Sequence, residues 1–262
     1  MVDEIQRRMT EAKIAHFDET GTRVDKKLWW VHVASNSEYS FFKISPKRGV
    51  NGIDECGVLP NFNGTAVHDC WSPYWKYGVT HAVCCAHLLR ELTGISENHK
   101  DQKWAPGFIS LLLAMKKAKE KAMESGKAEL SRYYYKKFDK QFDELIKLGR
   151  EENPMPEPDP NKKGGRRKKG KVLSLIERLE KYKESVCLFI NDFAVPFDNN
   201  QAERDLRMIK VKTKVSGCFR SENGAHDFLK AMSYIYTAHK HNINAYEAIL
   251  KAFTGTSEFI LE

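Results

Sequence analysis

Residues 27–44 read KLWWVHVASNSEYSFFKI, and this stretch carries the strongest signal for the fold. The runs 27–34 and 38–44 are rich in aromatic and β-branched residues, with Asn36 between them. This composition predicts two neighbouring strands of a β-meander. Just upstream, residues 13–18 (KIAHFD) predict a strand that ends at Asp18. The following Glu19, Thr20 and Gly21 predict a turn.

Further short elements complete the first ninety residues. Residues 49–57 predict a short helix, and residues 65–69 (TAVHD) predict a strand that ends at Asp69. Residues 78–85 (GVTHAVCC) predict an apolar strand that runs directly into a helical start at 86–92. This part of the chain is therefore predicted to consist mainly of strands and turns.

The rest of the chain has a helical pattern. Apolar residues at three- and four-residue spacing predict an antiparallel helical pair before residue 150. Residues 151–171 begin with prolines alternating with acids and end in a Gly/Lys/Arg run, which predicts a linker. Further helices are expected at about 172–190, after the turn at 196–203, near 225–240 and near 245–253.

Charge is distributed unevenly along the 262 residues. The net charge is +8, but residues 162–171 alone hold seven Lys or Arg and no acid. Residues 204–220 hold six more basic residues against one acid, so the remainder is mildly acidic. Two basic strips on an acidic body favour a polyanionic partner, with nucleic acid as the first expectation.

The sequence contains neither a candidate membrane helix nor a signal peptide, which bears on the cellular location of the protein. Apolar residues make up 41% of the chain, which is enough for a sizeable core. No apolar run approaches the ~20 residues of a membrane helix, and the N-terminus does not resemble a signal peptide. We therefore expect a soluble, cytoplasmic protein that does not bind membranes.

The six cysteines contain no C-x-x-C pair, and several lie in apolar runs. Reduced, buried cysteines in a cytosolic protein are the simplest interpretation. The local cluster of His81, Cys84, Cys85 and His87 leaves a zinc site as an alternative, but no distant second pair of ligands supports it.

Three carboxylates are candidates for a metal site. Asp18 and Asp69 each end a predicted strand, and ligands gather at the carboxyl ends of strands in α/β sheets. Glu203 falls in the first turn of a predicted helix and could supply a third acid. Mg²⁺ prefers such oxygen ligands, and two ions catalyse phosphoryl transfer.

Each acid also has a structural interpretation. Asp18 could begin a turn, and Asp69 could cap the segment after its strand. With Asn200 as N-cap, Glu203 would complete a capping box, and it also lies four residues before Arg207, an ion-pair spacing. Spacing alone therefore does not assign a function to the three acids.

Longer motifs do point to a family. The run VPFDNNQAERDLRMIK (195–210), with SGCFRS (216–221), resembles the C-terminal signature of DDE transposases of the insertion-sequence sixty-six family. HFDETG (16–21), KLWWVHVAS (27–35), PKRG (46–49), AVHDCW (66–71) and CCAHLLREL (84–92) also resemble family motifs, in family order. The resemblance covers nearly the whole chain.

This resemblance implies an α/β fold with a ribonuclease-H-like mixed sheet, flanking helices and a helical insertion. Residues 1–92 would form the first part of the catalytic core, 93–150 the helical insertion and 151–171 the Pro-rich, then basic, linker. Residues 172–262 would form the helical C-terminal part of the core, which carries the third catalytic acid.

The resemblance also implies roles for residues. Asp18, Asp69 and Glu203 match the three catalytic, metal-holding acids, and the cofactor would be two Mg²⁺ ions, or Mn²⁺. Asn199 and Asn200 would shape the turn that presents Glu203. His87, in the Cys84-x-x-His87 motif, would have a supporting role, with a satisfied histidine at a helix start as the alternative.

DNA is the implied partner, both as element ends and as target, and synapsis of two ends implies a homo-oligomer. The basic strips would hold DNA phosphates. The residues expected to do so are Arg204, Arg207, Lys210, Lys212, Lys214, Lys162, Lys163, Arg166, Arg167, Lys168 and Lys169. For the residues of the 162–171 run, a solvated linker is the alternative.

Family members carry an N-terminal DNA-recognition region, whereas this sequence begins just before the first catalytic strand. We therefore expect a catalytic domain that lacks that region. The expected activity is metal-dependent cleavage of phosphodiester bonds at element ends and strand transfer into target DNA. The alternative is a catalytically silent, truncated DNA-binding remnant that regulates or competes with an intact transposase.

Overall fold

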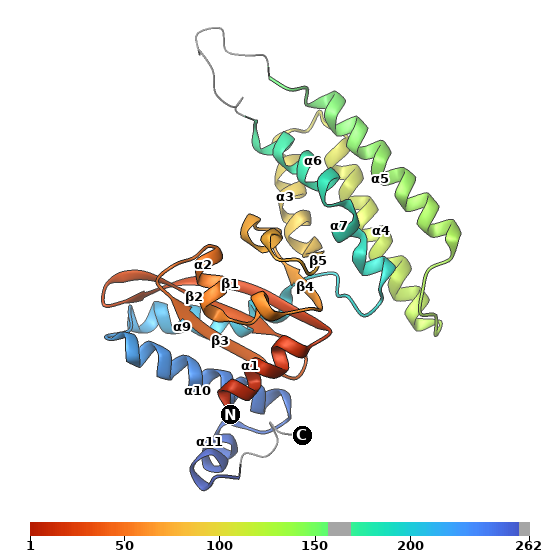
Figure 1. Cartoon of the computed structure of the whole chain (residues 1–262). Helices are drawn as coiled ribbons and strands as arrows, with labels where there is room; N and C mark the ends of the chain where they lie inside the picture. The colour runs from red at the N-terminus through yellow and green to blue at the C-terminus, as the bar shows by residue number, and fades with distance from the viewer. Residues whose placement is uncertain (157–168, 257–262) are drawn as a thin grey trace, which may run out of the picture. The chain divides into compact units, whose positions relative to one another are not determined.

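The computed structural model describes residues 1–156 and 169–256 (Figure 1). Two compact units make up the chain, and each is described by itself. Unit 1 combines Met1–Ala82 with the residues from Asn199 onward, and unit 2 is Val83–Asp198. In the described part of the chain, no helix is both long and apolar enough to cross a bilayer.

A five-stranded mixed sheet is the centre of unit 1. Its strands are β1 (Ile14–Val24), β2 (Lys27–Ser35), β3 (Ser40–Ser45), β4 (Thr65–His68) and β5 (Thr80–Val83), in the order β3-β2-β1-β4-β5. β1, β2 and β3 form an antiparallel meander, whereas β4 pairs with β1 in parallel. The predicted meander and the mixed α/β class are thus confirmed.

The turn predicted at residues 19–21 is wrong. β1 continues through these residues to Val24, because it pairs with β2 along its whole length beyond His16. The chain instead turns at Asp25 and Lys26, whose φ angles are 46° and 63°. Two successive residues with positive φ make the tight hairpin turn whose twist matches that of the strands.

Helices cover the two faces of the sheet with separate apolar clusters. One face packs against α1 (Val2–Glu11) and α2 (Val50–Cys56), and two short 3₁₀ segments, Leu59–Asn61 and Ser72–Lys76, lie nearby. The other face packs against α8 (Asn200–Asp205), α9 (Arg207–Ser216) and α10 (Glu222–Lys240), and α10 also contributes Tyr234 and Ala238 to the first cluster. α11 (Ala245–Thr254) follows and packs on α10.

The alternation of side chains along the strands decides which residues meet which helices. Ala15 and Phe17 of β1 belong to the cluster with α1 and α2. Val24 of β1 and Val31 and Val33 of β2 belong to the cluster with α8–α10. Even-numbered residues of β1, Asp18 among them, therefore lie on the face that α8 covers.

The sequence pattern did not predict α1. Its fully buried residues, Ile5 and Met9, are one helical turn apart, while most of the remaining residues are polar. So few buried apolar residues in a ten-residue helix give a weak periodic signal. Packing against β3 and α10 stabilises this helix more than its local sequence does.

Unit 2 consists mainly of helices. They are α3 (Cys85–Asn98), α4 (Trp104–Glu124), α5 (Arg132–Glu152), α6 (Lys171–Lys181) and α7 (Lys183–Asn191). α4 and α5 form the predicted pair, with Phe108 and Phe142 packed edge to face at 4.9 Å between ring centroids. The helix predicted at 172–190 is interrupted at Tyr182, where the backbone angles are −112° and 26°.

A buried ion pair fastens α8 to the rest of unit 1. Asp205 at the end of α8 accepts hydrogen bonds from the hydroxyls of Ser35 (2.5 Å) and Ser40 (2.6 Å), and from Nζ of Lys240 (3.0 Å). The Lys240 ammonium also donates to the carbonyls of Asn36 and Tyr39. Because both charges are buried and well hydrogen-bonded, losing either partner is costly.

We predict that Lys240→Met lowers the free energy of unfolding by about 3–5 kcal/mol, because it leaves the Asp205 carboxylate buried without its cation. Urea unfolding followed by circular dichroism measures this. Lys230→Met on the same helix is the control, since its pair with Asp227 is exposed and is worth at most about 1 kcal/mol. Equal losses in the two variants would contradict the prediction.

Candidate active site

Asp18 and Asp69 are brought together by the register of two parallel strands. In this pairing Ile14 lies opposite Thr65 and His16 opposite Val67. His16 and Val67 are the last of these pairs, and Asp18 and Asp69 each follow them by two positions, just past the end of β4 at His68. Both carboxylates therefore leave the sheet at one point, on the face that α8 covers.

Hydrogen bonds hold each acid by one oxygen. Oδ1 of Asp18 accepts from the backbone N–H of Glu19 (2.8 Å), and Oδ1 of Asp69 accepts from that of Trp71 (3.0 Å). Both bonds use Oδ1, so Oδ2 of each acid is available to a ligand. This arrangement orients the two carboxylates and leaves one oxygen of each for a ligand.

Burial makes the Asp18 carboxylate an unfavourable charge. Desolvation raises its pKa to about 7, and the neighbouring charges of Glu19 and Asp69 contribute to the rise, while Lys210 on α9 opposes it. A buried acid beside other acids is stabilised by any cation that reaches it. The electrostatics of the site thus favour a bound positive ion.

Glu203 is on α8, which packs against β1 and β2. Ala202, Asp205 and Leu206 are buried, while Arg204 and Arg207 are exposed. Glu203 lies between these two sides and is half-buried. The third predicted acid is therefore on a helix held against the strand of the first, on the same face of the sheet.

The capping box predicted for Glu203 is not formed as expected. Asn199, not Asn200, is the N-cap residue, and its side chain makes no cap hydrogen bond. Its fully buried amide instead bonds to β1: Nδ2 donates to the carbonyl of Phe17 (2.8 Å), and Oδ1 accepts from Nδ1 of His16 (2.8 Å). Asn199 thus joins the start of α8 to the two residues before Asp18.

Glu19 is a further acid, and no sequence pattern singled it out. Its carboxylate accepts from the Tyr74 hydroxyl (2.7 Å) and from the Arg48 guanidinium (2.8 Å). That guanidinium lies over the rings of Trp30 and Trp71, at 4.5 and 4.2 Å from their centroids. Burial raises the pKa of Glu19, so these partners offset the cost of its charge. Glu19 is thereby engaged on the other face of β1.

The basic residues after Glu203 lie on α8 and α9. Arg204, Arg207, Lys210 and Lys214 are exposed. Lys212 differs, because its ammonium lies 3.4 Å from the centroid of the Phe219 ring and its pKa is lowered by burial. In the basic strip at residues 162–171, the part that lies outside the described residues comprises Lys162, Lys163, Arg166, Arg167 and Lys168. Lys169 forms an ion pair with Glu177.

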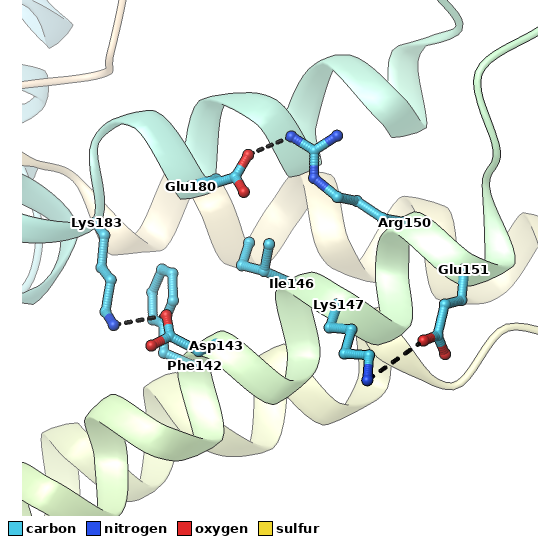
Figure 2. Close-up of a pocket in the computed structure, with 8 residues that line it drawn as sticks. All are labelled: Phe142, Asp143, Ile146, Lys147, Arg150, Glu151, Glu180 and Lys183. Carbon is cyan, nitrogen blue, oxygen red and sulfur yellow. Dashed lines mark hydrogen bonds and ion pairs between the residues drawn. The ribbon is translucent and has the colours of Figure 1, made fainter.

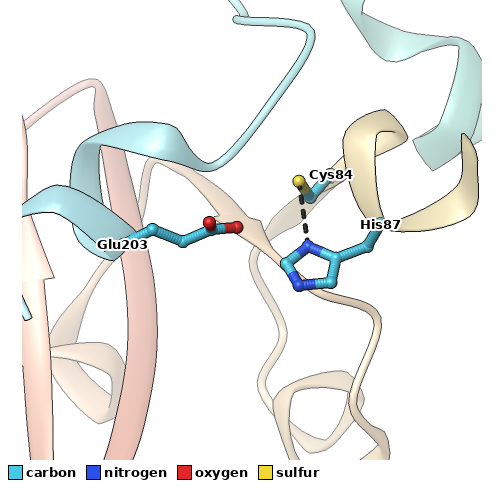
Figure 3. A group of neighbouring side chains, drawn as sticks. All are labelled: Cys84, His87 and Glu203. Atoms are coloured by element: carbon cyan, nitrogen blue, oxygen red, sulfur yellow. Dashed lines mark hydrogen bonds between the residues drawn. The ribbon is translucent and has the colours of Figure 1, made fainter. Parts of the chain in front are cut away.

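Cys84 and His87 form a local pair at the start of α3 in unit 2. Figure 3 shows the contact between them, in which Nδ1 of His87 lies 3.2 Å from Sγ of Cys84. The thiol of Cys85 instead points to the carbonyls of Val83 and Val186, and burial raises its pKa. His81 pairs with His68 at 3.0 Å. Of the four residues of the zinc alternative, Cys84 and His87 thus pair with each other, whereas His81 and Cys85 have other partners.

A groove on unit 2 has a different character. Figure 2 shows the ion pairs that line it, Arg150 with Glu180, Lys183 with Asp143, and Lys147 with Glu151. These charges neutralise one another within the groove. The arrangement resembles a salt-bridged surface between helices more than a site for chemistry.

The acids of unit 1 fit the divalent ions that the sequence resemblance implies. Asp18, Asp69 and Glu203 are hard oxygen donors, which suit Mg²⁺ or Mn²⁺. Burial and the neighbouring acids raise the pKa of Asp18, so a nearby cation would stabilise its charged form. Both the donor set and the electrostatics therefore suit a divalent cation.

We predict that Asn199→Ala lowers the free energy of unfolding by about 1–3 kcal/mol, because the buried Phe17 carbonyl loses its donor. Chemical unfolding measures the change. Asn200→Ala is the matched control, since Asn200 is adjacent but exposed. A loss in the control as large as in Asn199→Ala would contradict this role.

Asp18 should also make stability depend on pH. Its folded pKa of about 7 lies above its ordinary value of 3.8, so protonation favours the folded state. The wild type therefore loses stability as pH rises from about 4 through 7, by ~1.4 kcal/mol per unit of pKa shift. In EDTA, the stability of Asp18→Asn relative to the wild type should increase as pH rises over this range, and the difference should persist at higher pH.

Thermal unfolding at a series of pH values tests this prediction. Asp227→Asn on α10 is the control, because that side chain is 75% exposed. A stability difference between wild type and Asp18→Asn that stays constant from about pH 4 to about pH 8 would contradict the prediction.

Comparison with known proteins identifies the family. The comparison with curated proteins returns no match. Residues 1–227, which include all three acids, Asn199 and the basic helix α9, match the family model described as "Transposase IS66 family". The resemblance of the sequence motifs is thereby confirmed, and the chain belongs to the IS66 family of transposases.

Proposed function

We propose that unit 1 is the catalytic core of a DDE transposase. It would cleave phosphodiester bonds at the ends of a mobile DNA element and join the freed 3′-hydroxyl to target DNA. The observation that carries this proposal is the strand register that leads Asp18 and Asp69 out of the sheet together. Glu203, on a helix packed against the same strand, supplies the third acid.

The topology supports a ribonuclease-H-like core. An antiparallel meander of three strands is followed by a parallel β4 beside β1, with helices on both faces. This arrangement puts the first acid on the central strand and the second at the end of its parallel neighbour. A mixed sheet with flanking helices is what the family resemblance implies for such a core.

The three acids would hold two Mg²⁺ or Mn²⁺ ions. When bound, such ions lower the pKa of an attacking water and stabilise the leaving oxygen. The chain itself positions the groups: Asn199 holds β1 against the start of α8, and Asp205 anchors the end of α8. Fixed acids of this kind provide the pre-organised electrostatics on which phosphoryl transfer depends.

Basic residues would hold the DNA beside the acids. Arg204, Arg207, Lys210 and Lys214 are exposed on α8 and α9, and Lys210 is near enough to Asp18 to lower its pKa. A lysine beside the acids suits the phosphate of a bound strand. These contacts position DNA and do not read its sequence. We expect two DNA ends to be held by more than one copy of the chain.

We predict that Asp69→Asn and Glu203→Gln each reduce cleavage of a duplex carrying the element ends by about 10³-fold or more. The expected loss corresponds to several kcal/mol of charge stabilisation. Both variants should keep their DNA affinity within a few-fold, because phosphate contacts dominate that affinity. Gel analysis of cleavage in Mg²⁺ or Mn²⁺, with and without EDTA, measures the effect.

Asp227→Asn, an exposed acid on α10, is the control and should cleave like the wild type. Cleavage that persists in Asp69→Asn would refute the assignment of the acids. A wild-type protein that binds the element ends but does not cut them in either metal would instead support the silent DNA-binding remnant.

A further inference from the structure

The tip of the β1–β2 hairpin is basic and lies outside both basic strips of the sequence. Arg23, Lys26 and Lys27 are exposed there, and Asp25 is the one acid among residues 23–27. The turn carries no apolar side chain that packs into the core between Asp25 and Lys27. The charged ends of these side chains therefore lie at the surface of the fold.

Backbone hydrogen bonds connect this tip to the segment after α9. The N–H of Phe219 donates to the carbonyl of Arg23 (2.8 Å), and the N–H of Asp25 donates to the carbonyl of Phe219 (2.9 Å). Arg220, which is exposed, thus lies beside the hairpin tip. We call Arg23, Lys26, Lys27 and Arg220 the tip cluster.

The hairpin and α9 are also joined along their length. The hydroxyls of Thr22 on β1 and Thr213 on α9 lie 3.1 Å apart, and α9 packs on β1. Lys210 on α9 is near Asp18, whereas the C-terminal end of α9 leads to the tip cluster. Exposed basic side chains of α9, Lys210 and Lys214, therefore lie between the acids and the hairpin tip.

The tip is held in a defined shape. Asp25 and Lys26 have the positive φ angles of a tight turn, and Nη1 of Arg23 donates to the carbonyl of Lys26 (2.7 Å). A fixed guanidinium loses less conformational freedom on binding a phosphate than a mobile one does. This favours a binding role over that of a merely solvated turn.

The length of β1 relates the tip to the proposed chemistry. A strand rises ~3.3 Å per residue, so Val24 lies roughly 20 Å along the strand from Asp18. B-DNA rises about 3.4 Å per base pair. A duplex that follows α9 and β1 would span about six base pairs between the acids and the tip, which is a little over half a helical turn.

We propose that the tip cluster binds the phosphate backbone of duplex DNA about half a helical turn from the phosphate that is cleaved at the acids. This inference rests on the proposed function for the position of the cut, and it adds a second point of contact to the basic residues of α8 and α9. Two separated contacts would fix the direction of the duplex across unit 1.

The experiment measures the salt dependence of binding with a short fluorescein-labelled duplex and the whole chain. Arg23→Gln/Lys26→Asn/Lys27→Gln removes three charges, and Asn tolerates the positive φ of residue 26. Each lost phosphate contact lowers the slope of log affinity against log salt by about 0.9. We expect the slope to fall by about 2–3 and the affinity at physiological salt to fall more than tenfold.

Lys136→Gln/Lys137→Gln/Lys140→Gln on α5 is the matched control, with the same loss of charge from exposed lysines of unit 2. An equal fall in slope in this control would mean that only the net charge matters and would overturn the proposal. An unchanged slope in the tip variant would also overturn it, whatever happens to the affinity.

A second variant guards against damage to the turn. Lys27→Gln/Arg220→Gln leaves both turn residues intact, and its slope should fall by about 2 with an unchanged melting temperature. Asp69→Asn separates the two proposals, because it removes no tip charge. Cleavage that survives in Asp69→Asn would refute the proposed function, whereas the slopes alone decide the role of the tip.

Discussion

The central strand β1 has a different environment on either side of His16, and the candidate site depends on that change. At His16, β1 is paired with both β2 and β4, whereas farther on it keeps only β2. The Phe17 carbonyl, buried at this point, receives its hydrogen bond from the Asn199 amide. The Asn199 side chain thus supplies a hydrogen bond where pairing with β4 has ended. Asp18 follows directly after this point.

The buried charges of unit 1 differ in how well they are paired. The Asp205–Lys240 pair is buried, well hydrogen-bonded and stabilising for α8. Asp18, Glu19 and Asp69 lie close enough for their charges to repel one another, and Arg48 and Tyr74 engage only Glu19. The site therefore retains uncompensated negative charge, which is a common feature of functional sites. Under the proposed function, the exposed basic side chains along α9 would bind the phosphates of DNA.

Sequence patterns predicted some of these features and missed others, for identifiable reasons. Aromatic and β-branched runs predicted β2 and β3, because such side chains fit a half-buried sheet. The turn at Glu19–Gly21 was wrong, since pairing with β2 overrides local turn preference. The capping box with Asn200 as N-cap failed because α8 already begins at Asn200, so that Asn199 is the N-cap, and the Asn199 amide bonds to the Phe17 carbonyl. Lys240 and Asp205 are 35 residues apart, so no local pattern reveals their contact.

The sequence by itself determined the class of the sheet, the helical character of the second half, the basic strips and the family to which the chain belongs. These depend on local composition and on motifs, which need no knowledge of long-range contacts. Only the tertiary structure decided that Asp18 and Asp69 follow paired residues of neighbouring strands, that Asn199 joins α8 to β1, and that the hairpin tip lies beside the segment after α9. Each of these joins segments distant in sequence, and such pairings are set by the packing of the whole unit.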